Sequence, residues 1–251
     1  MSSRYVAPFG PSGSVEVDEA TARKLLGEAL SRGADYADLF FEYCAAGSYS
    51  FDEGILKSAG RSVSMGLGVR VMKGDSTGYA HVEELTPEAM SRAARTAANI
   101  ASAGPRHPGE SFAMASNPGR YDLPTISLDV PGVDKRALLE RADRRARAAD
   151  PRVVRVDASL VEQVREMLVV SSDGKMARDR QPIMRFGVRV LVEHEGRRES
   201  GSSGGGGRVG LEYFDGKSPE DHADESVRQA LVMLDASEAP AGELPVVLAP
   251  G

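Results

Sequence analysis

The chain has 251 residues, a formal net charge of −6, 41% hydrophobic and 27% charged residues. This balance predicts a soluble globular protein of one or two domains and excludes a disordered or fibrous chain. The negative charge and the lack of a Lys/Arg run disfavour nucleic-acid binding through phosphate neutralisation, and no apolar stretch approaches the length of a membrane span.

The N-terminal half predicts a helix, four strands and a second helix. The first 15 residues lack the apolar run and basic start of a signal peptide, so a cytoplasmic location is expected. Asp18 is typical of a helix cap, and Thr86 followed by proline is typical of another. Their helices are predicted over 18–32 and 86–104. Between them we expect strands at 37–44 and 48–58, with a turn at Glu53–Gly54, and a hairpin over 62–82.

Cys44 is the only cysteine, which excludes an intrachain disulfide. It lies in the apolar, aromatic segment LFFEYC, which predicts a buried strand. We therefore interpret Cys44 as an inert core thiol.

The C-terminal half predicts the same order of elements after a long Pro/Gly/Ser-rich connection over 105–132. A helix is expected at 134–149 and another at 218–234, where Ser218 caps and a proline follows. Three strand segments lie between these helices, at 152–163, 165–179 and 183–204. The second half thus resembles the first in its sequence of elements.

Short matches support an internal duplication. The tetrapeptide GVRV occurs at 68–71 and again at 187–190, and the helix starts TPE and SPE correspond in order. We predict an α+β fold in which antiparallel sheet layers pack against helices, built from two repeats of a helix–four strands–helix unit. The predicted boundaries are 1–116 for the first unit with the start of the connection and 117–251 for the second, both within one N-terminal domain of a longer protein.

Two catalytic patterns in the glycine-rich stretch lack the structural context that they require. GSSGG places Ser203 at the centre of G-x-S-x-G, but a nucleophile elbow needs a helix directly after the serine, and strand-like sequence follows here. GGGRVG over 205–210 satisfies G-x-G-x-x-G without the helix that a dinucleotide-binding turn opens. Neither a nucleophile nor a phosphate site is predicted.

Histidine spacing does not indicate a metal site. His194–Glu195 has no second histidine four or five residues on, and Gly196 favours a hairpin turn over the helix of a zincin motif. The remaining histidines, His81, His107 and His222, are scattered. The sequence assigns this chain no metal ligand and no catalytic acid/base pair.

Two interpretations remain for the four glycines. Gly204, Gly205, Gly206 and Gly207 are compatible with a flexible loop, which the residues alone favour. The alternative is backbone lying against a ligand or another chain, where Arg208 could hold a carboxylate.

Three blocks resemble the TldD/PmbA family, once described as modulators of DNA gyrase and regarded as metallopeptidases. They are DYADLFFEY (35–43), the block from Asp52 to Ile100 that contains GVRV and TGYA, and RESGSSGGGGRVGLEYF (198–214). The resemblance to the TldD branch extends from about residue 15 to 251, and its most specific parts are the block with GVRV and TGYA and the block SGGGGRVGLE.

The resemblance implies a zinc enzyme of two kinds of subunit. A TldD-type subunit binds zinc through His-Glu-x-x-x-His and a later cysteine, and a metal-free TldE/PmbA-type partner pairs with it. We expect this chain to associate with such a partner or with itself. Together they cleave unstructured peptides or peptide-derived natural products in a closed chamber. No residue of this chain matches a zinc ligand or the catalytic glutamate.

The resemblance therefore predicts the N-terminal scaffold and chamber wall of a TldD-like metallopeptidase, inactive as an isolated 251-residue chain. It also implies that residues 204–208 lie beside the substrate or the partner subunit. The alternative is a non-catalytic assembly subunit like the metal-free partner. A nucleic-acid-linked regulator rests only on the family's former description, and the negative charge disfavours it.

Overall fold

The computed structural model describes residues 4–10, 13–15, 17–102, 113–114, 125–237 and 241–249. Its helices are α1 (Glu19–Ala29), α2 (Pro87–Ala101), α3 (Gly132–Ala149), α4 (Tyr213–Gly216) and α5 (Pro219–Asp235), with a 3₁₀ turn η1 (Ser127–Asp129). Its strands are β1 (Tyr36–Asp52), β2 (Ile55–Lys73), β3 (Ser76–Val82), β4 (Ala113–Met114), β5 (Val153–Ser171), β6 (Lys175–His194) and β7 (Arg197–Gly207). No helix of the described part is long and apolar enough to cross a membrane.

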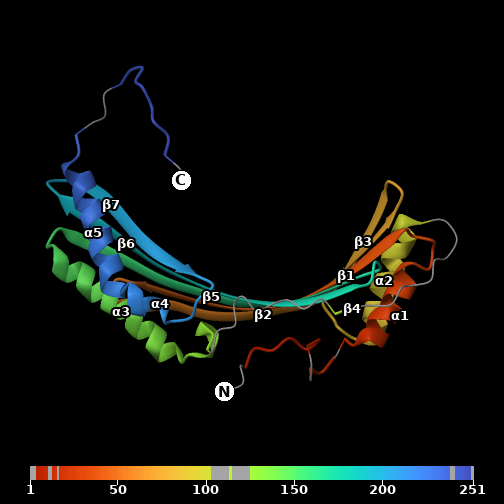
Figure 1. Ribbon diagram of the computed structural model, residues 1–251. Helices are drawn as coiled ribbons and strands as arrows, with labels where there is room; N and C mark the ends of the chain where they lie inside the picture. Colours follow the sequence, from red (N-terminus) through yellow and green to blue (C-terminus); the bar gives the residue numbers. More distant parts are fainter. Residues whose placement is uncertain are drawn as a thin grey trace.

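The described strands form a single sheet in the order β3-β2-β1-β5-β6, with β4 and β7 both pairing with β6. Every pairing is antiparallel except the short parallel contact of β4. Figure 1 shows a long curved sheet whose convex side carries α1 and α2 at one end and α3 and α5 at the other. None of the helices in the described residues lies on the concave face. The predicted α+β class is confirmed.

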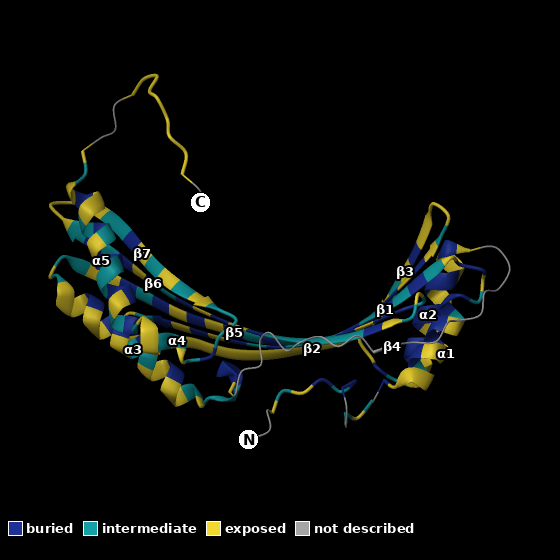
Figure 2. Ribbon diagram, in the orientation of Figure 1, coloured by how far each residue is buried: buried dark blue, intermediate teal, exposed yellow. Residues whose placement is uncertain are grey.

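Alternating burial along the strands assigns the two faces. In β1 the odd-numbered residues from Ala37 to Phe51 are buried, and the even-numbered residues are more exposed. The odd set faces the helices, since a strand places successive side chains on opposite faces. Two apolar cores follow, one under α1 and α2 around Phe41 and one under α3 and α5 around Phe186. Figure 2 shows both at the helix-covered ends.

The predicted number of strands is wrong, because the strands are longer than expected. Where four strands were predicted between the helices of each half, there are three: β1, β2 and the seven-residue β3 in the first half, and β5, β6 and β7 in the second. β1 runs without a break through Ala45–Gly47, and β2 through Ala59–Arg61, which are the gaps between the predicted strands. Cross-strand pairing carries both through, with Gly47 opposite Arg61. Both halves run helix, three strands, helix; the duplication itself stays a prediction.

Predicted turns and helix starts are confirmed where local chemistry fixes them. Glu53–Gly54 and Glu195–Gly196 link consecutive strands, and all four have positive φ, which suits tight hairpins. Asp18 Oδ1 accepts a hydrogen bond from the Thr21 N–H, a helix cap. Ser218 caps α5 in a reciprocal arrangement with Asp221.

A buried ion pair lies between the two cores. The Lys135 ammonium of α3 donates to the Glu162 carboxylate of β5, and both side chains are fully buried. Gly47 leaves room for this carboxylate, because a Cβ there would lie 2.8 Å from Glu162 Oε1. Burial lowers the pKa of Lys135, and the bond to Glu162 opposes that shift. Loss of Glu162 would leave the buried Lys135 ammonium without its ion-pair partner, whereas loss of Lys135 would leave Glu162 with Arg61 at 4.0 Å.

Candidate functional site

The glycine-rich stretch is an ordered strand. β7 pairs with β6 residue by residue, so that Gly204 lies opposite Gly187 and Gly206 opposite Arg185. The expected flexible loop is therefore wrong. β7 pairs with β6 on one side and packs against α5. It is therefore not surrounded by solvent, as a flexible linker would be.

Close packing within the chain explains four of the glycines. A Cβ at Gly204 would lie 2.6 Å from the Phe186 carbonyl oxygen. A Cβ at Gly201 would lie 2.1 Å from the Ser226 carbonyl oxygen of α5. A Cβ at Gly205 would lie 1.9 Å from the Tyr213 hydroxyl, and one at Gly206 would lie 2.0 Å from the Met184 carbonyl oxygen. These distances leave no space for a side chain. The close approach seen here is to the chain itself; the sequence alternative, an approach to a ligand or another chain, stays a prediction.

Ser203 fastens β7 to the helices. Its Oγ lies 2.9 Å from His222 Nδ1, and His222 Nε2 lies 2.9 Å from the Tyr213 hydroxyl. His222 is fully buried on α5, and burial is the main cause of its lowered pKa. Ser203 lies within a strand with no helix directly behind it, and His222 contacts a phenol where a catalytic triad has a carboxylate. The cluster is a structural clamp.

The outer edge of β7 is open at its glycines. The Ser202 N–H donates to Gln229 Oε1 of α5, at 3.4 Å, so Ser202 points its backbone groups away from β6. Backbone direction alternates along a strand, so Gly204 and Gly206 also point their N–H and C=O groups outward. No strand of the described residues pairs with this edge. Two glycine peptide groups are thereby left for an external partner.

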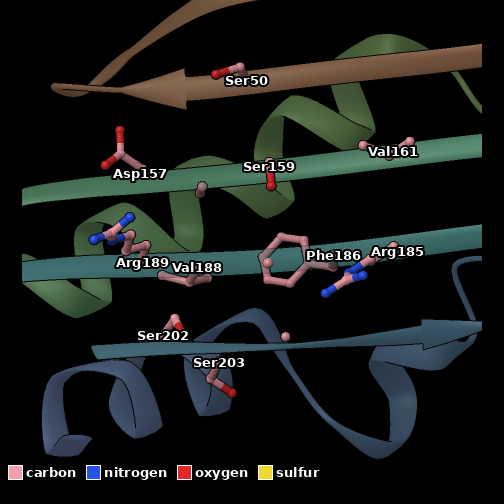
Figure 3. A pocket seen from close by; sticks show the side chains of 13 residues that line it. Ser50, Asp157, Ser159, Val161, Arg185, Phe186, Val188, Arg189, Ser202 and Ser203 are labelled. Carbon is pink, nitrogen blue, oxygen red and sulfur yellow. The ribbon is translucent and has the colours of Figure 1, made fainter. Parts of the chain in front are cut away.

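A polar hollow of about 420 Å³ lies on the concave face beside this edge. Figure 3 shows it lying across neighbouring strands, with Arg185 and Arg189 on one of them. On these strands, serines and glycines on the concave face alternate with larger residues whose side chains point to the convex face. Small residues therefore make up much of the floor of the hollow. Its small concave residues are Ser50, Ser159, Gly187, Ser202 and Gly204.

The charged side chains that line the hollow differ in whether they have an ion-pair partner. Asp157 is ion-paired with Arg155, which also binds Asp52. Arg189 donates to the Ser200 hydroxyl at 3.3 Å. Within the described ranges, neither Arg185 nor Arg189 has a carboxylate at ion-pair distance. The hollow therefore has two guanidinium groups available to an anion.

The described residues do not form a metal site. No three His, Cys, Asp or Glu side chains in that part of the chain come together in a group that could hold an ion. His81 stacks on Tyr79 of β3, His194 lies at the exposed end of β6, and His222 is occupied by Ser203 and Tyr213. His107 lies outside the described residues. These side chains do not fit zinc ligation, so ligands from elsewhere stay a prediction.

The remaining predicted residues have definite places. Cys44 is half-buried on the concave side of β1, opposite Arg165 of β5, and burial raises its thiol pKa. It is thus less deeply buried than the core interpretation requires. Gly207 ends β7, and half-buried Arg208 follows it. Arg185 and Arg189 were not singled out, although their even spacing puts them on one strand face.

Two family models match the chain. Residues 37–101 match PmbA/TldA metallopeptidase domain 1, and residues 126–234 match the PmbA/TldA metallopeptidase central domain. Together they include both halves of the sheet.

Curated relatives carry the description "Metalloprotease TldD homolog". The Haemophilus influenzae protein is 37% identical over 227 residues, which is 88% of this chain and 47% of that protein. The Buchnera aphidicola (subsp. Schizaphis graminum) protein is 34% identical over 233 residues, or 90% and 48%. The chain spans about half the length of these relatives.

Solved structures share the fold. A proposed DNA gyrase modulator from Thermotoga maritima aligns with a TM-score of 0.71 at 16% identity, over 89% of this chain and 50% of that one. TldE from Thermococcus kodakarensis aligns with a TM-score of 0.63 at 16% identity, over 84% and 47%. At this identity the likeness bears on the fold alone.

Proposed function

Because the chain belongs to the PmbA/TldD metallopeptidase family, of which it contains the first and central domains, we propose that it forms the substrate-binding wall of a cytoplasmic, TldD-like zinc metallopeptidase. The substrates are unstructured peptides or peptide-derived natural products. A TldE/PmbA-like subunit is the proposed partner. The zinc ligands and the catalytic glutamate come from polypeptide other than these residues, so the isolated chain does not hydrolyse peptides.

The open glycine edge of β7 is the observation that carries this proposal. Outward peptide groups at Gly204 and Gly206 can bond an extended peptide as an added strand, a recognition mode that depends on backbone and tolerates many sequences. Ser200 and Ser202 continue the same concave row with small side chains. An added strand would therefore meet little steric hindrance. A folded substrate could not supply the free strand that this mode needs.

Strand addition can be tested by methylating the peptide and leaving the protein unchanged. An unstructured hexapeptide is titrated onto the 251-residue chain, followed by backbone-amide NMR, and each peptide nitrogen is N-methylated in turn. Since only alternate N–H groups of an added strand face its neighbour, methylation at one parity abolishes binding. Methylation at the other parity is the matched control and leaves binding within about threefold.

Equal loss at both parities, or shifts that avoid Gly204 and Gly206, would contradict strand addition. Hydrolysis of the peptide by the purified chain alone would contradict the scaffold role.

A second candidate is a non-catalytic assembly subunit. It would resemble the metal-free TldE/PmbA partner, whereas the sequence identity to TldD homologs favours the first candidate. Coding sequence past Gly251 discriminates them: a His-Glu-x-x-x-His motif there selects the peptidase, and coding sequence of family length without one selects the assembly subunit.

A further inference from the structure

Beyond backbone pairing, we propose that the polar hollow on β5–β7 binds a carboxylate of the extended peptide through Arg185 and Arg189. The inference rests on the proposed function, since the peptide backbone is taken to lie along the edge of β7. Backbone pairing alone does not discriminate between peptide side chains, so the two arginines would add a preference for an acidic group. Substrates with an acidic group at one register position would thus be favoured.

The register brings the two arginines within reach of an added strand. Arg185 lies opposite Gly206, and Arg189 opposite Ser202, with Gly187 and Gly204 paired between them. Neighbouring strands are about 4.8 Å apart, so an added strand lies about 9.6 Å from β6. A glutamate side chain and an arginine side chain together span that distance. The glycines and serines of β7 leave the space between them clear.

The charge balance favours an anion over a cation. Asp157, the acid lining the hollow, is held by Arg155. Arg189 lies opposite Asp157 in the β5–β6 pairing but donates to the Ser200 hydroxyl, and neither Arg189 nor Arg185 has an ion pair among the described residues. The guanidinium fork matches a carboxylate in two-bond geometry. Hydroxyls of Ser50, Ser159 and Ser202 add donors around the same volume.

The carboxylate can be a side chain or the peptide's C-terminus, and three peptides separate these sources. All share one apolar extended sequence: one has glutamate with an amidated end, one has glutamine with a free end, and one has glutamine with an amidated end. Each is titrated onto the 251-residue chain by calorimetry and by backbone-amide NMR. At least one carboxylate peptide is expected to bind about tenfold tighter than the uncharged peptide.

Variants that remove one positive charge test whether Arg185 and Arg189 cause the preference for a carboxylate. R185Q and R189Q are expected to abolish the tenfold difference while leaving binding of the uncharged peptide unchanged. R92Q is the matched control, because Arg92 is exposed on α2, at the other end of the sheet, and loses the same charge. Far-UV circular dichroism of all three variants checks that the fold is retained.

The outcomes separate the two proposals. Equal binding of all three peptides, with shifts at Gly204 and Gly206, overturns the carboxylate inference and leaves strand addition standing. A preference that survives R185Q and R189Q overturns the assignment to these arginines. Absence of binding by every peptide overturns both proposals.

Discussion

At the scale of single residues, the side chain of His222 is held in place by burial and by hydrogen bonds to both ring nitrogens. Its two ring nitrogens are taken by Ser203 and Tyr213, and the ring is fully buried between β7 and α5. Burial is the largest cause of its lowered pKa; the Lys217 charge adds to it and Asp221 opposes it. His222 is therefore protonated at a lower pH in the folded chain than in the unfolded chain, where its pKa is near the ordinary value of 6.5.

This difference predicts a pH-dependent stability. As pH falls below about 6.5, the unfolded state binds more protons at this residue, so the free energy of unfolding declines, by at most about 1.4 kcal/mol per pH unit. H222Q removes the titration. Urea unfolding at pH 5.5 and 7.5 should show a smaller drop in H222Q than in the wild type. Equal drops would contradict this role of His222.

At the scale of elements, one contact is used at both ends of the sheet. Gly78 of β3 lies against α2, where a Cβ would be 2.1 Å from the Ala97 carbonyl oxygen. Gly201 of β7 lies against α5 at the same distance from the Ser226 carbonyl oxygen. Glycine in the strand lets each helix backbone approach the sheet directly, which fixes where β7 and its open edge lie.

Substitution of Gly201 should therefore be costly. G201A forces α5 away from β7, and overpacking of this kind destabilises by about 1–3 kcal/mol. G27A is the matched control: Gly27 lies in α1 with open space at its Cβ position, so alanine there should be neutral or stabilise by up to about 1 kcal/mol. Urea denaturation measures both. A neutral G201A would show that α5 shifts without cost.

Structural features that depend on nearby residues could be predicted from the sequence, and features that depend on residues far away in the chain could not. Asp18 and Ser218 specify their helix starts through nearby backbone, and Gly54 and Gly196 specify their turns by conformation. The continuity of β1 depends on strands that pair with it from elsewhere in the chain. For the same reason the Ser203–His222–Tyr213 clamp, which joins three elements, left no spacing to recognise.

At the scale of the whole molecule, β1 and β5 belong to both cores. β1 buries Phe41 in the first core and Phe51 in the second. β5 contributes Leu168 to the first and Leu160 to the second, and the two strands pair from Asp38–Ser171 to Asp52–Asp157. Neither core can lose its sheet without exposing part of the other.

Unfolding is accordingly expected to be a single transition, although the chain has two cores. Secondary structure followed by far-UV circular dichroism and tyrosine packing followed in the near UV should give coincident urea curves. The chain has seven tyrosines and no tryptophan, so the near-UV signal reports tyrosines in both halves. Two resolved steps would show that the halves unfold separately.

The shared ladder between β1 and β5 also limits how the halves can be recombined. A chimaera that took residues 1–102 from one relative and 125–251 from another would have to preserve the alignment of Glu42 with Met167. A slip of one residue would turn the concave row of β5, which includes Gln163 and Arg165, into the helix-facing interior. Exchange of halves between relatives therefore requires that the pairing register of β1 and β5 be kept.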